Sequence, residues 1–555
     1  MTDKTSVQAL VLICKHMGVE NVVISPGSRN APLINGFSSD DFNLTHVPDE
    51  RVAGYFALGQ ALATGSPTVL CCTSGTAGLN YAPAIAEAYY QGVPLLICTA
   101  DRPSEWIDMG IGQSIRQSDM YDNYVKNSFQ LIQEASTDQD LWHNERQICE
   151  AINLTKALPQ GPVHVNLPFR ESLYGKSDEY KLRHPITRQV QAIPALADQT
   201  KDELLMLWQG AKRKMILIGQ QYDGSALAAP LQRMIDEGDV IVLSETTSNL
   251  SLSHSIDNID RVLPLVDEQG RPDLVISIGD AIVSKRIKRY LKDAKPEYHW
   301  WLGQNTPRNT FQRLSHVIPV SAADFLENLS KTASPNDNRF QSTWDKADAS
   351  AKSLHEVYLS QLTSFCDIKV FEFLLANMPD NAVLHLANST PIRYSQLFKK
   401  SDGIKYLSNR GVSGIDGSTS TALGFASRTP NHNVLITGDI SFYYDSNAFW
   451  LNLLPTNLTI VLINNGGGDI FRYIPGPDTT DNEEAFTTPH NMDAVHICKL
   501  YGITHTKVSD AKGLQDVWSE WQTSQGEKLR LLEVDTSKYT NAHVLRDYFS
   551  YLSNG

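Results

Sequence analysis

Short apolar segments rich in β-branched residues recur along this chain, and each one ends at Gly, Ser, Thr, Asn or Asp before a stretch with helical character. Buried parallel strands in βα units have this appearance, because helices cover both faces of a parallel sheet. The segments form three groups in sequence order: 21–25, 68–73, 94–99 and 162–166; then 214–219, 240–245 and 274–279; then 382–386, 434–438, 458–464 and 529–534. The pattern predicts an α/β fold of three consecutive domains, each with a mainly parallel sheet flanked by helices.

Two polar stretches separate the groups of strands. Residues 171–200 have no clear periodicity, and residues 330–350 contain the Ser-, Asp- and Asn-rich segment 334–342. We interpret both stretches as linkers, which predicts domains over 1–180, 190–340 and 355–555. The length of 555 residues agrees with this number of domains. Ligands are expected at the carboxyl ends of the strands in each sheet.

The charge balance limits the partners of the protein. The chain has 48 Lys and Arg residues against 62 Asp and Glu, which gives a formal net charge of −14. Broad binding to nucleic acid or to an anionic membrane requires a positive field, so the sequence argues against both. No segment has the roughly 18 consecutive apolar residues of a membrane-spanning helix.

The N-terminus and the cysteines indicate the compartment. The apolar stretch 9–14 is too short for a signal-peptide core, so residues 1–18 are expected to form a first amphipathic helix. The seven cysteines include no C-x-x-C pair, and most of them lie in apolar segments. We expect buried, reduced thiols in a soluble, unexported, cytoplasmic protein.

The third group of strands holds the most specific constellation of polar residues. One strand ends in Gly438-Asp439-Ile440-Ser441, and 26 residues after Asp439 another strand ends in Asn464-Asn465-Gly466-Gly467-Gly468-Asp469. A carboxylate, a side-chain amide and backbone carbonyls are hard oxygen ligands of the kind that Mg²⁺ prefers, with phosphates completing its coordination. Glycines allow the backbone to approach a diphosphate closely, and a following helix can offer its first N–H groups. Singly these are ordinary loop features, but their order and spacing favour a site for a metal and a diphosphate.

This constellation resembles the signature of the thiamine-diphosphate enzymes, in which Gly-Asp is followed further along the chain by Asn-Asn. The resemblance implies that thiamine diphosphate binds with Mg²⁺, or with Mn²⁺ in its place, and that Asp439, Asn465 and the carbonyl of Gly467 hold the metal. Gly438, Ile440 and Ser441 would also contact the cofactor. Most members carry Gly where this chain has Ile440, and Gly-Asp-hydrophobic-Ser is a variant associated with one branch of the family.

Glu50 stands just before an Ala- and Gly-rich helix expected over 53–63. A Glu at a helix start is most often a residue that stabilises the helix dipole. The family resemblance instead assigns to Glu50 a hydrogen bond to the aminopyrimidine ring, which favours the tautomer that can remove the thiazolium proton. The cofactor then supplies the nucleophile, and no Ser, Cys or His nucleophile is required.

The resemblance also implies how the parts of the chain divide their roles. Domain 1–180 would bind the aminopyrimidine, 190–340 would be a central Rossmann-like domain without flavin, and 355–555 would bind the diphosphate and metal. Because Glu50 and the metal ligands lie in different domains, family architecture implies a homodimer or homotetramer with active sites between subunits.

Six cationic side chains fall in predicted strand-end loops of this acidic chain. Arg binds carboxylates bidentately and Lys adds a point charge, so the set favours a pocket for polycarboxylates. The six residues are Arg29, Arg102, Lys285, Arg286, Arg393 and Arg410.

The loops that carry these cations resemble those of a carboligase branch of the family that acts in menaquinone biosynthesis. The most specific motifs are Ser-Pro-Gly-Ser-Arg at 25–29, Ala-Asp-Arg-Pro at 100–103 and Asn-Arg-Gly-Val-Ser-Gly-Ile-Asp-Gly at 409–417, and the resemblance covers the whole chain. It implies a transferase that decarboxylates 2-oxoglutarate and adds the four-carbon carbanion to isochorismate in a 1,4 sense. Ile415 would force the cofactor into a bent shape, and Ile470 and Phe471 would line the pocket near the thiazolium. The residues implied around the two substrates are Ser28, Arg29, Arg102, Gln113, Lys285, Arg286, Ser389, Arg393 and Arg410.

Three alternatives remain open from the sequence. An acetolactate-synthase-like carboligase acting on pyruvate would not require so many cationic loops, since pyruvate has one carboxylate. A catalytically silent cofactor-binding subunit, or a nucleotide-binding module on the same sheets, would have no need of Glu50. A Rossmann dehydrogenase is disfavoured because no G-x-G-x-x-G follows the first strand, and the loop 74–78 has the wrong spacing.

Overall fold

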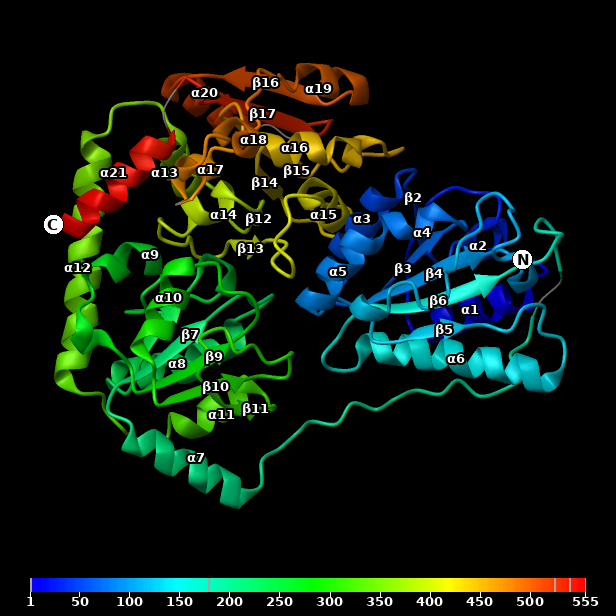
Figure 1. The fold of residues 1–555 in the computed structure, drawn as a ribbon, viewed down its shortest axis with the longest axis horizontal. Helices are drawn as coiled ribbons and strands as arrows, with labels where there is room; N and C mark the ends of the chain where they lie inside the picture. Colours follow the sequence, from blue (N-terminus) through cyan, green and yellow to red (C-terminus); the bar gives the residue numbers. More distant parts are fainter. Residues whose placement is uncertain (1, 178–179, 475, 524–525, 539–540, 555) are drawn as a thin grey trace.

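The computed structural model describes residues 2–177, 180–474, 476–523, 526–538 and 541–554. Met1 and Gly555, the outer ends of the expected domains, lie outside these residues. The described chain contains three parallel sheets flanked by helices, with strand orders β2-β1-β3-β4-β6-β5, β11-β10-β9-β7-β8 and β13-β12-β14-β15-β17-β16. Figure 1 shows the first sheet on the right, the second at the lower left and the third at the top. The predicted α/β fold with three mainly parallel sheets is confirmed.

The first sheet and its helices are formed by the N-terminal part of the chain. Its strands are β1 (Asn21–Ile24), β2 (Asn43–His46), β3 (Thr68–Cys72), β4 (Leu95–Asp101), β5 (Ser128–Gln130) and β6 (Val163–Pro168). Its helices are α1 (Thr5–His16), α2 (Ala31–Phe37), α3 (Glu50–Thr64), α4 (Thr76–Asn80), α5 (Ala82–Gln91) and α6 (Asp138–Lys156), with 3₁₀ turns η1 (Ser104–Trp106) and η2 (Asp122–Tyr124). Helix α1 confirms the helix expected at the N-terminus.

The second sheet follows α7 (Asp198–Gly210). Its strands are β7 (Lys214–Ile218), β8 (Ile241–Ser244), β9 (Leu274–Ile278), β10 (Tyr298–Leu302) and β11 (Leu314–Ile318). The remaining helices are α8 (Ser225–Asp236), α9 (Ile259–Val262), α10 (Lys285–Ala294) and α11 (Ala322–Leu329), with η3 (Thr246–Ser248), η4 (Leu263–Leu265) and η5 (Glu268–Gly270).

The third sheet is formed by the C-terminal part of the chain. Its strands are β12 (Val383–Leu386), β13 (Lys405–Leu407), β14 (Asn433–Gly438), β15 (Leu458–Asn464), β16 (Thr504–Val508) and β17 (Arg530–Asp535). The helices of this part of the chain are α12 (Asn338–Gln361), α13 (Asp367–Ala376), α14 (Thr390–Ser395), α15 (Ser418–Ala426), α16 (Asp439–Tyr444), α17 (Ile470–Tyr473), α18 (Glu483–Thr487), α19 (Val495–Tyr501), α20 (Ala511–Thr523) and α21 (Asn541–Asn554), with η6 (Ser446–Phe449) and η7 (Pro477–Thr479).

The strands that the sequence pattern did not predict are mostly at sheet edges. Each predicted strand is present within one or two residues of its expected bounds, whereas β2, β5, β11, β13 and β16 are edge strands that were not predicted. Strands β2, β11 and β16 carry exposed side chains, so they lack the continuous apolar signal of a central strand. Strand β10 lies inside its sheet, but it contains Trp300 and Trp301 rather than a β-branched run.

The two expected linkers have different structures. Residues 180–197 contain neither helix nor strand, and Figure 1 shows the chain crossing as an extended segment to α7. The linker expected over 330–350 is wrong from residue 338 onward, because α12 begins there. The side chain of Asp337 caps this helix by accepting from the N–H groups of Arg339 and Phe340, while Phe340 and Trp344 are buried on the second sheet's side. The helix was not predicted because the polar composition of this segment outweighed its N-cap and the helical spacing of its apolar residues.

Helices α3 and α15 join the first and third sheets through a very close contact. Their side chains belong to one hydrophobic core that contains Phe56 and Leu423. A Cβ atom on Gly59 of α3 would overlap the carbonyl oxygen of Thr421, and one on Gly424 of α15 would overlap the carbonyl oxygen of Phe56. Only glycine lets the two backbones approach this closely, so these two positions fix the placement of one sheet against the other.

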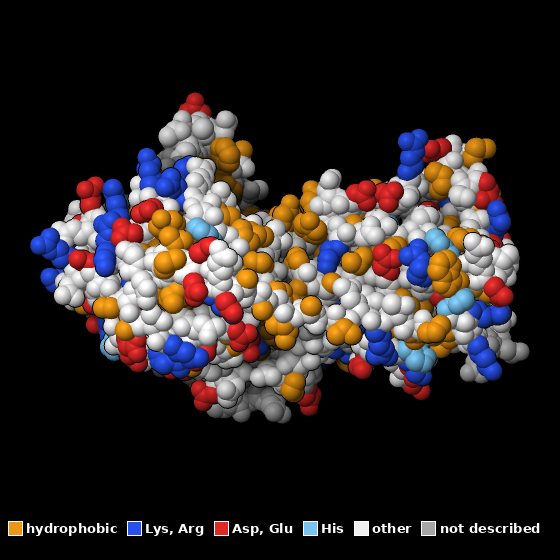
Figure 2. Space-filling model, turned by 90° about the horizontal axis from the view of Figure 1, so that it is seen from below, with side chains coloured by type: hydrophobic (Ala, Val, Ile, Leu, Met, Phe, Trp, Pro, Cys, Tyr) orange, Lys and Arg blue, Asp and Glu red, His pale blue; other side chains and the backbone are white. Residues whose placement is uncertain are grey.

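The remaining expectations about surface and thiols can be compared directly with the structure. Each of the seven cysteines lies in the described part of the chain, is buried and forms no disulfide. None of the helices within the described ranges combines the length and the apolar character needed to cross a membrane. Acidic and basic side chains are interspersed on the face that Figure 2 shows.

Candidate functional site

Parallel pairing of β14 with β15 brings the two polar motifs of the third sheet together. Gly438 pairs with Ile463, so Asp439 and Asn465 leave adjacent strands at the same edge. Asp439 is buried, and its Oδ1 accepts from the N–H of Ile440 at 2.7 Å. Its Oδ2 accepts from the N–H groups of Gly466 at 2.9 Å and Gly467 at 3.0 Å. A carboxylate has about four acceptor positions, so this one can still bind a cation.

The amide of Asn465 is held in one orientation. Its Nδ2 donates to Oδ2 of Asp367 at 2.9 Å, while its Oδ1 is buried and has no hydrogen-bond partner among the described residues. Buried acceptors in folded proteins are normally paired, so an unpaired amide oxygen beside Asp439 fits a metal ligand. Burial raises the pKa of Asp367 to about 7, although hydrogen bonds from Thr536 and Asn465 oppose this rise.

Gly467 adopts a backbone conformation that its neighbours require. Its φ is +147°, and a Cβ atom there would lie 2.6 Å from the carbonyl oxygen of Thr487. Its own carbonyl accepts from the N–H of Asp469 at 2.9 Å and retains a second lone pair. After this turn Ile470 is buried, and the ring of Phe471 lies 6.0 Å from that of Phe486. The donor set of Asp439, Asn465 and Gly467 therefore fits a divalent cation.

The loop that carries Ile415 is tied to both neighbouring helices. The hydroxyl of Ser441 on α16 donates to the carbonyl of Ile415 at 2.5 Å. The next residue, Asp416, accepts from the hydroxyl of Tyr55 on α3 at 2.7 Å. Ile415 itself is half-buried, and its backbone is held beside Ser441 by this hydrogen bond.

Glu50 is the first residue of α3, which begins three residues before the helix expected over 53–63. The cap of this helix is Asp49, which accepts from the N–H groups of Arg51 and Val52. Asp49 also accepts from the amide of Asn447 at 2.8 Å, so the start of α3 lies against the segment that follows α16. Burial raises the pKa of the half-buried Glu50 carboxyl, and the charge of Asp49 adds to this effect.

Four predicted substrate residues lie at the carboxyl edge of the first sheet. Arg29 is buried and donates to the carbonyl of Phe169 at 3.0 Å and to Glu171 at 2.9 Å. Arg102 donates to the carbonyl of Gly112 at 3.0 Å, and burial together with the charge of Arg29 lowers its pKa. The other two residues of this group, which are more exposed, are Ser28 and Gln113.

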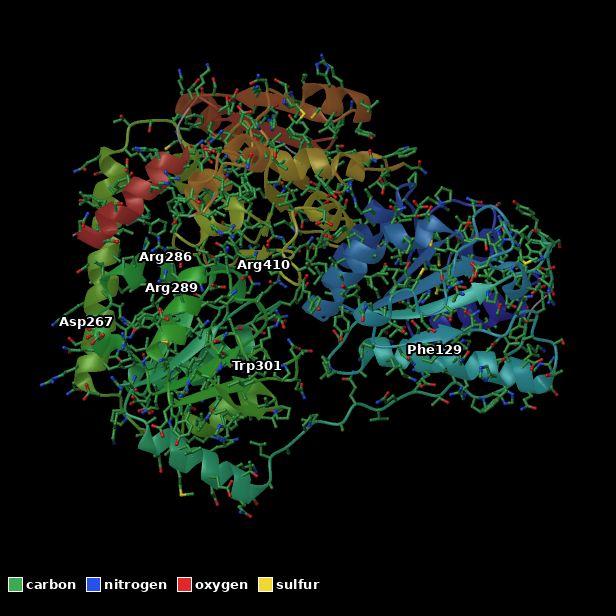
Figure 3. The ribbon with its side chains drawn as sticks, viewed as in Figure 1. Phe129, Asp267, Arg286, Arg289, Trp301 and Arg410 are labelled. Atoms are coloured by element: carbon green, nitrogen blue, oxygen red, sulfur yellow. The ribbon has the colours of Figure 1, made fainter. Side chains whose placement is uncertain are left out.

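The other predicted substrate residues lie at the start of α10 beside the second sheet, and at α14 and the loop after β13 beside the third. Arg286 contacts the hydroxyl of Tyr473 at 3.4 Å, which places it at the end of α17. Burial raises the pKa of Asp260, and the charges of Arg286 and Arg393 oppose this rise, so both cations are near this carboxylate. Figure 3 shows Arg286 and Arg410 where these two sheets meet. The members of this second group are Lys285, Arg286, Ser389, Arg393 and Arg410.

Two cationic residues near Arg410 were not predicted from the sequence. Lys288 and Arg308 line, with Arg410, a pocket of about 210 Å³ between the second and third sheets. Burial lowers the pKa of Lys288. A signal was available for Lys288, because it lies one helical turn after Lys285 on the same face of α10. Within one chain the cations therefore form two groups, one on the first sheet and one between the other two.

Known protein families match both ends of this chain. Residues 4–125 match the N-terminal TPP-binding domain of thiamine pyrophosphate enzymes, and residues 389–534 match the C-terminal TPP-binding domain. The 2-succinyl-5-enolpyruvyl-6-hydroxy-3-cyclohexene-1-carboxylate (SEPHCHC) synthase of Porphyromonas gingivalis is 39% identical over 100% of this chain and 98% of its own length. The synthase of Flavobacterium johnsoniae is 39% identical over 98% of both chains, and that of Bacteroides fragilis is 34% identical over 100% of both.

This chain belongs to the SEPHCHC synthase family of thiamine pyrophosphate enzymes. Solved structures agree at the level of the fold. A benzoylformate decarboxylase from Polynucleobacter necessarius matches 96% of the chain with a TM-score of 0.72 and 16% identity. A thiamine diphosphate-dependent 4-hydroxybenzoylformate decarboxylase from Rhodococcus jostii matches with a TM-score of 0.69 and 18% identity. The family membership that the sequence motifs predicted is confirmed. The SEPHCHC synthases are the relatives with which the site residues of this chain can be compared.

Proposed function

We propose that this chain catalyses the thiamine diphosphate-dependent decarboxylation of 2-oxoglutarate and the 1,4-addition of the resulting succinyl-semialdehyde carbanion to isochorismate. The products are SEPHCHC and CO₂, so the enzyme is a transferase of menaquinone biosynthesis. The observation that carries the proposal is similarity to SEPHCHC synthases along the full length of the chain.

The metal and diphosphate would be held at the carboxyl edge of the third sheet. Asp439, Asn465 and the carbonyl of Gly467 would bind Mg²⁺, or Mn²⁺ in its place, and the unpaired amide oxygen of Asn465 supports this role. Gly438, Ile440 and Ser441 would surround the diphosphate. When bound, the cofactor supplies the carbanion chemistry that amino-acid side chains lack.

The remaining cofactor contacts would orient the rings and exclude water. Ile415 would press against the cofactor to bend it, and Ile470 and Phe471 would line the pocket near the thiazolium. Glu50 would share a proton with a nitrogen of the aminopyrimidine. The raised pKa of its carboxyl supports this role, because burial favours the protonated form, which can donate to a ring nitrogen.

The two groups of cations would bind the two dianionic substrates. Arg and Lys side chains form charge-assisted hydrogen bonds with carboxylates, and the two substrates together carry four carboxylates. The first group is Ser28, Arg29, Arg102 and Gln113, and the second is Lys285, Arg286, Ser389, Arg393 and Arg410.

A homodimer or homotetramer would complete each active site between subunits. Exposed apolar side chains on the third sheet's side of the chain support an interface there, since Leu453 is 86% and Trp450 56% exposed. Domains over 1–180, 190–340 and 355–555 remain our proposal for the division of the chain. We also propose a cytoplasmic enzyme that binds no nucleic acid.

A two-substrate assay tests the reaction. Purified protein with thiamine diphosphate and Mg²⁺ should release CO₂ from 2-oxoglutarate and consume isochorismate in equal amounts. Pyruvate in place of 2-oxoglutarate is the control for the alternative carboligase. Turnover of pyruvate, or no consumption of isochorismate, would overturn the proposal.

A further inference from the structure

Asp367 lies beside the candidate metal ligands without being one of them. It is the first residue of α13, it is 1% exposed, and its backbone N–H donates to Oδ1 of Asn541 at 2.8 Å. Its Oδ1 accepts from the hydroxyl of Thr536 at 2.6 Å, and its Oδ2 accepts from Nδ2 of Asn465 at 2.9 Å. We propose that Asp367 is a positioning residue that holds the Asn465 amide with its oxygen directed at the metal. This inference rests on the proposed metal site.

The chemistry of the two side chains determines which way the amide faces. Both oxygens of Asp367 accept hydrogen bonds, from Thr536 and Asn465, whereas an amide has a donor side and an acceptor side. The NH₂ group of Asn465 must therefore face Asp367, and Oδ1 must face the other way. The absence of a partner for that oxygen among the described residues agrees with this orientation. A cation would pair with this amide oxygen. Residues that hydrogen-bond to metal ligands commonly orient those ligands in this way.

The position of Asp367 is itself fixed from three sides. Thr536 follows β17, Asn541 begins α21, and Asn465 follows β15, so three separate segments contact one side chain or its backbone. The carboxylate also lies at the start of α13, where the helix N-terminus carries a partial positive charge. Because Asp367 hydrogen-bonds the amide of the candidate ligand Asn465, it would act on the metal site through Asn465.

A reciprocal exchange of the two side chains tests this role. Asn465→Asp places two carboxylates opposite one another, and Asp367→Asn replaces an acceptor by an amide that can also turn its NH₂ group toward Asn465 and so no longer fixes the orientation of that residue. Each change should weaken Mg²⁺-dependent binding of thiamine diphosphate by about tenfold or more. The double variant Asp367→Asn/Asn465→Asp restores a donor facing an acceptor and an oxygen facing the metal. It should recover an affinity within about threefold of the original. Titration calorimetry at several Mg²⁺ concentrations measures this without any turnover.

Controls separate positioning from folding and from the proposed function. Asp239→Asn changes another buried carboxylate, which accepts from the N–H of Ser334, and should leave the Mg²⁺ titration unchanged. Thermal melting without Mg²⁺ reports on folding, and a single variant that fails to fold leaves the double variant as the test. A double variant as weak as either single one, or two unaffected single variants, overturns the inference. If the unaltered protein binds no thiamine diphosphate, the proposed function fails instead.

Discussion

The carboxylate of Glu87 accepts a hydrogen bond from the backbone N–H of Gly411 at 2.6 Å. Glu87 is 2% exposed on α5 of the first sheet, and it also accepts from the N–H of Val412 at 2.7 Å. A Cβ atom on Gly411 would lie 2.5 Å from the carbonyl oxygen of Glu87, so the contact requires glycine. The first sheet thus holds the loop that presents Arg410.

Glu87→Ala should therefore affect both stability and substrate binding. Two partly buried N–H groups would lose their acceptor, and the loss of each hydrogen bond typically costs about 0.5–1.5 kcal/mol. We expect weaker stability in urea unfolding and a higher KM for the substrate that Arg410 contacts. Unfolding curves and KM values that match the original would show that the loop keeps its place without Glu87.

Asp439→Ala should weaken metal and cofactor binding together. The carboxylate accepts from three backbone N–H groups of the metal loop and its own turn, so its loss removes a ligand and the support of that loop. We expect at least about a 100-fold loss of affinity for thiamine diphosphate in the presence of Mg²⁺, which corresponds to about 2.7 kcal/mol. Calorimetric titration of cofactor, with and without a chelator, measures this. A normal titration would exclude Asp439 from the metal site.

Glu50→Gln should retain cofactor binding and lose most activity. Glutamine preserves the shape of the side chain but cannot exchange a proton, and removal of such a group typically costs about 10²–10⁴-fold in rate. The rate of CO₂ release at saturating 2-oxoglutarate and isochorismate measures the loss, and a cofactor titration is its control. Undiminished turnover would remove Glu50 from its assigned role.

Gly59→Ala should destabilise the contact between the first and third sheets. The new methyl group would overlap the carbonyl oxygen of Thr421, and overpacking of this kind typically costs about 1–3 kcal/mol. Gly210→Ala is the matched control, because a Cβ atom there meets nothing within 4 Å. Urea unfolding should separate the two variants. Equal stability would mean that α3 and α15 can move apart at little cost.

Glu245 predicts a dependence of stability on pH. Burial raises the pKa of this carboxyl to about 7, although the N–H groups of Ser284 and Val283 and the charge of Arg410 oppose the rise. The folded state therefore favours the protonated form, so stability should fall as pH rises from the ordinary carboxyl pKa of about 4.3 through about 7. In Glu245→Gln this dependence should disappear, although the lost acceptor lowers stability by a constant amount. Urea unfolding at pH 5, 6, 7 and 8 compares the slopes, and parallel slopes would contradict the assignment.

Much of the candidate site followed from local patterns. Asp439 and Asn465 were predicted together because each comes directly after an apolar strand, and adjacent parallel strands end at one sheet edge. Glu50 was placed correctly at a helix start by the Ala- and Gly-rich stretch behind it. The edge strands and α12 were missed, since their apolar signal is weaker than their polar one.

The sequence by itself determined the α/β class, the central strands, the residues at their ends and the family, because these depend on patterns within a few tens of residues. Tertiary structure decided which of those ends meet. Asp367 and Asn465 are 98 residues apart, and Glu87 and Gly411 are 324 apart, so no periodicity could pair them. It also decided that the cations divide into two groups within one chain. Such pairings arise from the packing of whole sheets and helices, which buries polar groups that must then find partners across long separations.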